Sequence, residues 1–361
     1  MTEILSQLAE ISRFFGRDPE CVVAGGGNTS CKTEDTLWVK ASGFPLATIT
    51  EEGFAVLERT ELAKIAKKSY SDDPVERESQ IKDDLFRSSL YPEKGLRPSV
   101  ETSLHDAIDY TFVVHTHPTV ANALLCSKNV EQKVRDLFGD EALYVPYTDP
   151  GFTLFKLVAQ RITAYEQEHG RQPAIILLQN HGVFVGADSA DEIKVLHDKV
   201  LNTINREIKI KPDWTEITVA SGLEKILPAL RMMLSQDSLK VLRYRRNELI
   251  EQFSKSPDAF AKASLPFTPD HIVYCKAHPL YLEAEENPAV MCENMASKVE
   301  NFRTEYGYDP KVIIIQGVGL VAAENTAKDA DTVLDVYEDL LKISCLSENF
   351  GGPRFLSPAE I

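Results

Sequence analysis

The chain contains few cysteines, and none of them forms a recognisable motif. Its 361 residues include six cysteines, widely separated and without a C-x-x-C pair, at positions Cys21, Cys31, Cys126, Cys275, Cys292 and Cys345. Small disulfide-bonded scaffolds and cysteine-based zinc modules are therefore excluded. We expect reduced, mostly buried thiols and a cytoplasmic protein.

The sequence also lacks long apolar runs. No stretch of about 18 apolar residues occurs, so no membrane-spanning helix is predicted. The N-terminal residues show no basic region followed by an apolar core, and we therefore expect no signal peptide. A membrane is not an expected partner.

Basic charge is scarce as well. The chain has 39 lysines and arginines against 55 aspartates and glutamates, a formal net charge of −16. Nucleic-acid binding needs a basic surface, and the one basic cluster, Arg243–Arg246, is followed by Glu248 and Glu251. We predict that this cluster is a solvated helix face and that the protein has no nucleic-acid partner.

Two histidines stand at alternate positions of a predicted strand. The segment Phe112-Val113-Val114-His115-Thr116-His117 has strong β propensity. Alternate side chains of a strand leave the same face, so His115 and His117 point the same way, about 7 Å apart at Cα. That spacing allows two imidazoles to bind one metal ion. Two polar residues at a strand end are the simpler interpretation of the pair alone.

A third histidine follows another apolar strand. Residues 174–178 are typical of a buried strand, and Gln179-Asn180-His181-Gly182 links them to the apolar segment Val183–Gly186. A buried imidazole needs polar partners. Taken alone, His181 is best explained as a core histidine that is hydrogen-bonded to polar partners. Together with His115 and His117 it is better explained as a third metal ligand.

Two segments rich in glycine or serine follow predicted strands near the N-terminus. A helix is predicted over residues 2–15, and the strand Cys21–Ala24 then leads into the turn Gly25–Ser30. A second strand, Thr36–Lys40, ends at Ala41-Ser42-Gly43. Backbone N–H groups of such turns can bind an anion. Plain tight turns remain the alternative, because the first segment matches no nucleotide-binding motif.

Glu101 lies at the start of a predicted helix that leads into the histidine strand. Pro98 disfavours helix before it and Ser99 is a good N-cap, so Glu101 falls in the first turn. A structural capping role is one interpretation, since the helix dipole favours a carboxylate there. A site residue is the other, because the start of this helix can fold back near the sheet.

The segment around His181 recurs near the C-terminus. Val312–Gly319 matches Ile175–Gly182 after a shift of 137 residues (312 − 175), with Val318 in the place of His181. In both copies a helix-capping pattern follows. A weaker similarity links His271–Pro279 to the histidine strand. The last third of the chain is therefore predicted to be a related unit without a metal site.

This second copy contains a misleading motif. Gly317-Val318-Gly319-Leu320-Val321-Ala322 fits the G-x-G-x-x-A pattern of dinucleotide-binding folds. However, the apolar strand continues to Ala323, the helix starts only near Asn325, and no later strand ends in an acid. We therefore predict no NAD binding.

Together these motifs resemble those of the class II aldolase/adducin family, in the same order and with similar spacing. The residues concerned are Gly25–Asn28, Lys40–Gly43, Glu101, His115-Thr116-His117 and Gln179–Gly182. The similarity covers about residues 1–210. The whole length resembles the aldolase portion of two-part rhamnulose-1-phosphate aldolase/dehydrogenase proteins.

The resemblance implies a fold, a domain division and an assembly. It implies a three-layer α/β/α fold with a mixed, mostly antiparallel central sheet, followed by a smaller degenerate α/β unit. The corresponding domains are residues 1–215, catalytic, and 216–361, without metal ligands. Family members form tetramers whose sites lie between subunits, so we expect a homotetramer. A neighbouring subunit often contributes a tyrosine, which cannot be assigned from this sequence.

The resemblance also implies the site residues. His115, His117 and His181 would bind Zn²⁺ or another divalent transition metal, and Glu101 would be the catalytic acid/base. The substrate phosphate would be bound by Asn28, Thr29, Ser42, Gly43 and Ser99. One residue departs from the family pattern: a second phosphate-binding serine often precedes the glutamate, and here that residue is Val100.

The expected function is that of a metal-dependent aldolase, an aldehyde-lyase of carbohydrate metabolism. It would cleave a ketose 1-phosphate, such as rhamnulose 1-phosphate in rhamnose catabolism, through a metal-bound enediolate. Three neutral imidazoles leave zinc its charge and an open position, as in catalytic sites. Two alternatives remain: a sugar-phosphate epimerase or dehydratase of the same family, and a non-catalytic adducin-like binding module.

Overall fold

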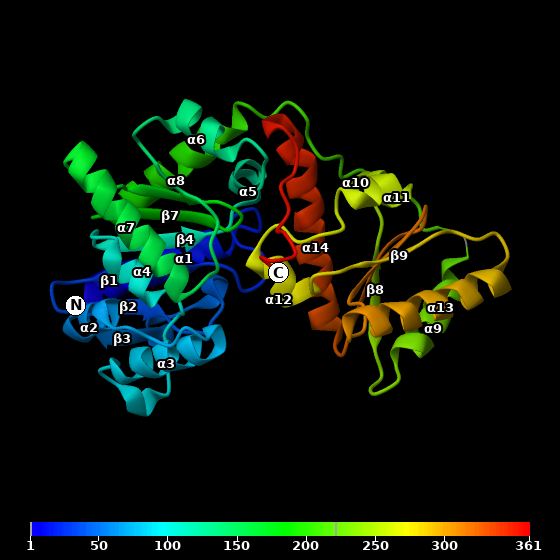
Figure 1. Ribbon diagram of the computed structural model, residues 1–361, viewed down its shortest axis with the longest axis horizontal. Helices are drawn as coiled ribbons and strands as arrows, with labels where there is room; N and C mark the ends of the chain where they lie inside the picture. The colour runs from blue at the N-terminus through cyan, green and yellow to red at the C-terminus, as the bar shows by residue number, and fades with distance from the viewer. Residues whose placement is uncertain (1, 221) are drawn as a thin grey trace. The chain divides into compact units, whose positions relative to one another are not determined.

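A computed structural model describes residues 2–220 and 222–361. The chain divides into two compact units, Met1–Leu125 with Asn129–Glu207, and Cys126–Lys128 with Ile208–Ile361 (Figure 1). Within the described residues, no helix is long and apolar enough to cross a membrane. Each unit is built around its own β-sheet.

The first unit contains a mixed sheet with the order β3-β2-β1-β4-β7-β6-β5. Only the β5–β6 pair is parallel, and every other neighbouring pair is antiparallel. The strands are β1 (Asn28–Lys32), β2 (Thr36–Lys40), β3 (Phe54–Glu58), β4 (Phe112–Thr116), β5 (Leu143–Val145), β6 (Ile175–Leu178) and β7 (Gly182–Ala187).

Helices cover both faces of this sheet. On one face, apolar side chains of the sheet such as Val39, Val113 and Phe184 share a core with α2 (Arg59–Lys67), α3 (Pro74–Arg87), α4 (Thr102–Ala107) and α7 (Phe152–His169). On the other face pack α1 (Thr2–Gly16), α5 (Thr119–Leu125) and α8 (Ala190–Asn205), with α6 (Val130–Phe138) against α5. The expected three-layer α/β/α fold with a mostly antiparallel sheet is confirmed.

The second unit is a smaller α/β unit, as expected. Its sheet has the order β8-β11-β10-β9, in which β9 and β10 are parallel. The strands are β8 (Val241–Arg245), β9 (Leu280–Leu282), β10 (Val312–Ile315) and β11 (Gly319–Glu324). The helices are α9 (Leu223–Leu234), α10 (Glu248–Ser254), α11 (Pro257–Ala261), α12 (Pro269–Cys275), α13 (Pro288–Tyr306) and α14 (Ala327–Ser347).

The N-terminal strand prediction was wrong in its position. Cys21–Ala24 forms no strand, and β1 starts only at Asn28, within the segment predicted to be a turn. All five residues of β1 are buried although four of them are polar. Propensity favours the apolar Cys21–Ala24 segment, but pairing on both sides with β2 and β4 makes the polar segment the strand.

Two predictions in the second unit were also wrong. Arg243–Arg245 belong to strand β8 rather than to a helix, and their charges pair with Asp331, Asp335 and Glu338 of α14. The segment His271–Pro279, compared above with the histidine strand, begins within helix α12, which ends at Cys275, and contains no strand. The strand that pairs with β11 as β4 pairs with β7 is instead β8.

Candidate metal centre

Three histidine side chains converge at one end of the central strands of the first unit. His115 lies on β4, His117 follows the end of that strand, and His181 lies between β6 and β7. The Nε2 atom of His115 lies 2.9 Å from Nε2 of His117 and 3.3 Å from Nε2 of His181. Among the described residues, these three form the one group of potential metal ligands whose ligand atoms lie within 4.8 Å of one another.

Small residues allow this close approach. A Cβ atom at Gly182 would lie 2.6 Å from both Cδ2 of His117 and the carbonyl oxygen of Thr116. A Cβ atom at Gly27 would lie 2.7 Å from the carbonyl oxygen of His115, and the φ angle of Gly27 is +75°. Glycine is the residue that tolerates both the positive φ and the contact. The two glycines therefore let the histidine segment pack against its neighbours.

The tautomer of His115 follows from its surroundings. Its Nδ1 lies 3.0 Å from the carbonyl oxygen of Val183, and its ring stacks on Phe184 with a centroid distance of 4.0 Å. Because a carbonyl oxygen only accepts hydrogen bonds, Nδ1 carries the proton and donates it. In the neutral ring, Nε2 then keeps a lone pair directed at the other two histidines. This is the arrangement that metal-ligating histidines show.

Glu101 reaches the same point from helix α4. Its Oε1 lies 3.3 Å from Nε2 of His181 and 3.5 Å from Nε2 of His115. The carboxylate is buried, and among the described residues Oε1 accepts no hydrogen bond. Its other oxygen, Oε2, accepts a bond of 2.5 Å from Nδ2 of Asn28. One carboxylate oxygen is thus held by the protein and the other faces the histidines.

These donors fit a divalent cation. In a tetrahedral zinc site with Zn–N bonds of about 2.0–2.1 Å, ligand nitrogens lie about 3.3 Å apart, and the observed separations of 2.9 and 3.3 Å are close to that value. Within the part of the chain that the structure describes, the buried Oε1 has no hydrogen-bond partner, and such an atom is stabilised by a positive neighbour. The residues present therefore match a metal site with three imidazoles and an adjacent carboxylate.

The start of α4 differs slightly from the prediction. Glu101 occupies the N-cap position and its side chain makes no capping bond. The hydroxyl of Ser99 instead accepts the backbone N–H of Glu101 at 3.2 Å and a bond from Nδ2 of Asn28 at 3.2 Å. Because the Glu101 carboxylate caps no helix, it is available to the histidine cluster.

The residues expected to bind phosphate are placed in different ways. Asn28 and Ser99 contact each other beside Glu101. The loop with Ser42 and Gly43 is exposed. It lies beside the segment that leads to Ser99, since the N–H of Ser42 donates to the carbonyl of Arg97 at 2.8 Å. The side chain of Thr29 lies apart from them, where its hydroxyl bonds that of Ser12 on α1 at 2.6 Å.

Two buried residues near the site were missed from the sequence. Lys40, the last residue of β2, is buried; burial lowers the pKa of its ammonium, and the charge of Glu101 acts in the opposite direction. His105, on α4, is fully buried and bonds to both Ser30 and Asn28. The signal for His105 was its spacing, four residues after Glu101, which places both on one face of a helix.

Comparison with known proteins identifies the family. Residues 6–202 match the family described as Class II Aldolase and Adducin N-terminal domain, and residues 221–308 match Aldolase class II, second domain. A Bacillus subtilis protein described as the uncharacterized oxidoreductase YuxG is 27% identical over 367 residues. The match covers 90% of this chain and 51% of YuxG, so the chain spans about half the length of that relative.

Solved structures of similar proteins include several aldolases. An N-terminal class II aldolase domain from Thermoplasma acidophilum is 28% identical, with a TM-score of 0.47, over 55% of this chain and 91% of that one. An L-fuculose-1-phosphate aldolase from Thermus thermophilus is 18% identical, with a TM-score of 0.35, over 55% and 93% of the two chains. From the match over residues 6–202, this chain belongs to the class II aldolase and adducin family.

Proposed function

We propose that this chain is a metal-dependent class II aldolase that cleaves a ketose 1-phosphate, such as rhamnulose 1-phosphate, by retro-aldol chemistry. The observation that carries the proposal is the convergence of Oε1 of Glu101 with the Nε2 atoms of His115 and His181. An adducin-like binding module has no need of a buried carboxylate beside three imidazoles. An acid/base beside a metal site is what an aldolase requires.

The three histidines would hold the metal, and Glu101 would move protons. When bound, a divalent ion such as Zn²⁺ would act as a Lewis acid on the negative charge that develops as the carbon–carbon bond breaks. Glu101, fixed at Oε2 by Asn28, offers Oε1 as the base that takes the proton of the substrate hydroxyl. The same carboxyl group then returns a proton to the carbon of the other product.

The phosphate end of the substrate would lie among Asn28, Ser42, Gly43 and Ser99. Ser42 and Gly43 lie on an exposed loop, and Gly43 has a φ angle of +91°. Such a loop can turn its backbone N–H groups toward an anion. Val100 supplies no hydroxyl, so fewer side-chain bonds to the phosphate are available than in relatives with a serine at this position.

The first experiment combines metal analysis with two substitutions. We expect Glu101→Gln to keep the metal and to lower kcat by about 10²- to 10⁴-fold, the typical contribution of a general acid/base. We expect His181→Ala to lose both metal and turnover. Elemental analysis of the purified protein and steady-state kinetics measure the two effects. The exposed Glu93 and the helix-end His169 provide the matched controls, Glu93→Gln and His169→Ala.

The outcomes separate the parts of the proposal. Wild-type turnover in Glu101→Gln would remove Glu101 from the mechanism. A protein that holds no divalent metal and gains no activity with added zinc would contradict the metal site.

Substrate assays test the reaction itself. Ketose 1-phosphates are supplied to the metal-loaded protein, and release of lactaldehyde or glycolaldehyde is measured. Aldehyde release identifies an aldolase. Conversion to an isomeric or dehydrated sugar phosphate without aldehyde would instead identify an epimerase or a dehydratase. A metal-loaded protein that turns over none of them would point to a binding module.

A further inference from the structure

A chain of four polar side chains connects the interior of the first unit to Glu101. Oγ of Ser30 lies 2.7 Å from Nδ1 of His105, and Nε2 of His105 contacts Oδ1 of Asn28. Nδ2 of Asn28 in turn donates to Oε2 of Glu101 at 2.5 Å. All four side chains are buried. Buried polar chains of this kind hold each member in one orientation, provided that every bond is satisfied.

The direction of every bond in this chain is determined by chemistry. Oδ1 of Asn28 can only accept, so Nε2 of His105 carries the proton and donates it. In a neutral imidazole Nδ1 is then an acceptor, and the hydroxyl of Ser30 must be the donor. Burial supports the neutral ring, since it lowers the pKa of His105 well below its usual range.

Regular secondary structure holds the residues at both ends of this hydrogen-bonded series of side chains. Asn28 and Ser30 are alternate residues of β1 and therefore project from the same face of the sheet. His105 follows Glu101 by four residues, and its backbone N–H donates to the carbonyl of Glu101 at 3.1 Å. The two side chains thus lie on one face of the helical turn, with Asn28 between them.

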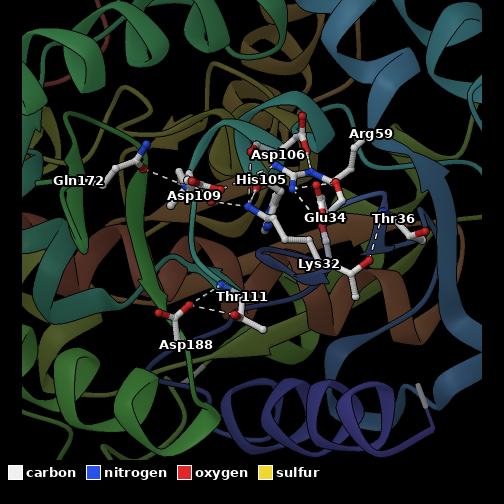
Figure 2. Close-up of polar contacts among 12 residues, drawn as sticks. Lys32, Glu34, Thr36, Arg59, His105, Asp106, Asp109, Thr111, Gln172 and Asp188 are labelled. Carbon is white, nitrogen blue, oxygen red and sulfur yellow. Dashed lines mark hydrogen bonds and ion pairs between the residues drawn. The ribbon is translucent and has the colours of Figure 1, made fainter.

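The other end of helix α4 is anchored as well. The buried ammonium of Lys32 donates to the carbonyl oxygens of His105 and Ile108, as the close-up of this region shows for His105 (Figure 2). Arg59 bonds the carboxylate of Asp106 in the same region at 2.6 Å (Figure 2). The backbone that carries His105 is therefore fixed independently of the metal ligands.

We propose that His105 is a positioning residue for the acid/base, an inference that rests on the proposed aldolase function. Its Nε2–H fixes the amide of Asn28 so that Nδ2 faces Glu101. That bond holds Oε2 and leaves Oε1 directed at the histidine cluster. Nδ2 also donates to Oγ of Ser99, but a hydroxyl can donate as well as accept. Without the His105 donor, the Asn28 amide can therefore turn its oxygen toward Ser99 and the carboxylate, which would repel Glu101 from its place.

A purely structural role is the competing explanation, and the molecule contains a control for it. His197 is another buried histidine of the first unit, which lies on α8 and bonds Oγ1 of Thr116 at 2.9 Å. This bond joins it to neither Asn28 nor Glu101, so its removal should cost stability without disturbing the acid/base. His105→Leu and His197→Leu are therefore a matched pair.

Kinetics distinguish the two roles. We expect His105→Leu to lower kcat by about 10- to 100-fold, with KM and bound metal close to wild type, as is typical when a residue that orients a site is lost. His105→Gln keeps an N–H donor for Oδ1 of Asn28 and should recover most of kcat. His197→Leu should keep kcat. Equal kcat losses in His105→Leu and His197→Leu, or no recovery in His105→Gln, would overturn the proposal.

A spectroscopic measurement tests the bond independently of activity. Solid-state NMR of the zinc-loaded protein labelled with ¹⁵N-histidine reports the tautomer of each ring, and the His105→Gln variant assigns the signal. We expect His105 to be neutral and protonated at Nε2. Protonation at Nδ1 would overturn the inference even in an active aldolase. If the Nε2–H tautomer is found but no ketose phosphate is cleaved, the proposed function fails instead.

Discussion

At the scale of single residues, the site depends on the absence of a side chain as much as on its ligands. Gly182 pairs with Leu178 at the start of β7 and leaves room for the ring of His117 and the carbonyl of Thr116. A contact of 2.6 Å with a backbone atom cannot be relieved by rotating a side chain. Any residue larger than glycine must move the histidine segment.

We therefore expect Gly182→Ala to weaken metal binding by about 10- to 100-fold, the size of effect seen when ligand orientation is disturbed. Titration of the metal-free protein with zinc measures it. Gly186→Ala is the control, because Gly186 lies on the same strand, β7, and its Cβ would meet the ring of Tyr110 at 2.6 Å instead of a histidine. Equal zinc affinity of Gly182→Ala and wild type would contradict the steric explanation.

The pH dependence of stability provides a second test at this scale. Burial lowers the pKa of His197 from 6.5 to about 4, although the charge of Asp18 acts in the opposite direction. In the unfolded chain the His197 ring therefore becomes protonated below pH 6.5, whereas in the folded protein it becomes protonated only near pH 4. His197 thus contributes stability that is complete above pH 6.5 and is lost as the pH falls through that window.

The expected loss is about 3 kcal/mol between pH 6.5 and pH 4, from 1.36 kcal/mol per pKa unit. Urea unfolding of wild type and His197→Gln at several pH values measures it, since the other titrating groups are common to both proteins. We expect the wild type to lose more stability than the variant across this window. Parallel pH profiles of the two proteins would show that His197 titrates normally in the folded state.

At the scale of elements, strand β1 holds both the site and the helix that carries Glu101. Successive side chains of β1 alternate between the two faces of the sheet. Asn28 and Ser30 therefore point toward the site, and Thr29 points toward α1, where its hydroxyl bonds that of Ser12. The same strand provides Lys32, whose ammonium bonds carbonyl groups at the end of α4. One short polar strand therefore fixes both ends of α4.

We expect Lys32→Met to destabilise the first unit by about 1–3 kcal/mol, because buried carbonyl oxygens at the end of α4 lose their donor. Urea unfolding measures the change. Lys64→Met is the control, since Lys64 is 70% exposed and its pair with Glu61 lies on the surface; such surface changes stay within about 0.5 kcal/mol. A Lys32→Met protein as stable as the control would show that the Lys32 bonds contribute nothing net.

The sequence predicts elements well where burial and hydrophobic pattern agree. The opening helix, β2, the histidine strand β4 and the apolar strands β6 and β7 were predicted and are confirmed. Strand β1 was missed because its residues are polar and become buried only through pairing with β2 and β4. Strand β3 was missed because its five residues lie between the polar stretches Thr50–Glu52 and Arg59–Glu61.

In the candidate site, the types of residue could be predicted from the sequence, but several of their contacts could not. The three histidines and Glu101 stand out because their types and spacing fit a metal site, and the fold brings them together. The contact between Asn28 and Glu101 spans 73 residues, and the contact between His105 and Asn28 spans 77. Such pairings depend on how β1 lies against α4, which no local pattern encodes.

At the scale of the whole molecule, the two units share an order of elements. The sheet order β4-β7-β6-β5 in the first unit corresponds to β8-β11-β10-β9 in the second. Each of β5, β6 and β7 lies 137 residues before its counterpart (143 to 280, 175 to 312, 182 to 319). The N–H of Gln179 donates to Val145, and the N–H of Gln316 donates to Leu282, in the corresponding place.

This correspondence identifies what replaces the histidines. His115 pairs with Phe184, and Tyr244 pairs with Val321, which lies 137 residues after Phe184. Tyr244 therefore takes the place of His115, and Arg246 takes that of His117. Val318 stands where His181 stood, and its carbonyl accepts the hydroxyl of Tyr244 at 2.7 Å. Neither an arginine nor a valine binds a metal cation.

We therefore expect the protein to bind one zinc ion per chain, and His117→Ala to reduce that value to background. Elemental analysis after dialysis against zinc-free buffer measures both. Arg246→Ala is the matched control at the corresponding position of the second unit. It should keep the metal, because the Arg246 guanidinium forms an ion pair with Glu251 and binds no metal ion. A second zinc ion that survives in His117→Ala would show that the second unit is not the metal-free copy proposed for residues 216–361. Loss of zinc in Arg246→Ala would contradict the assignment of the metal to the histidines of the first unit alone.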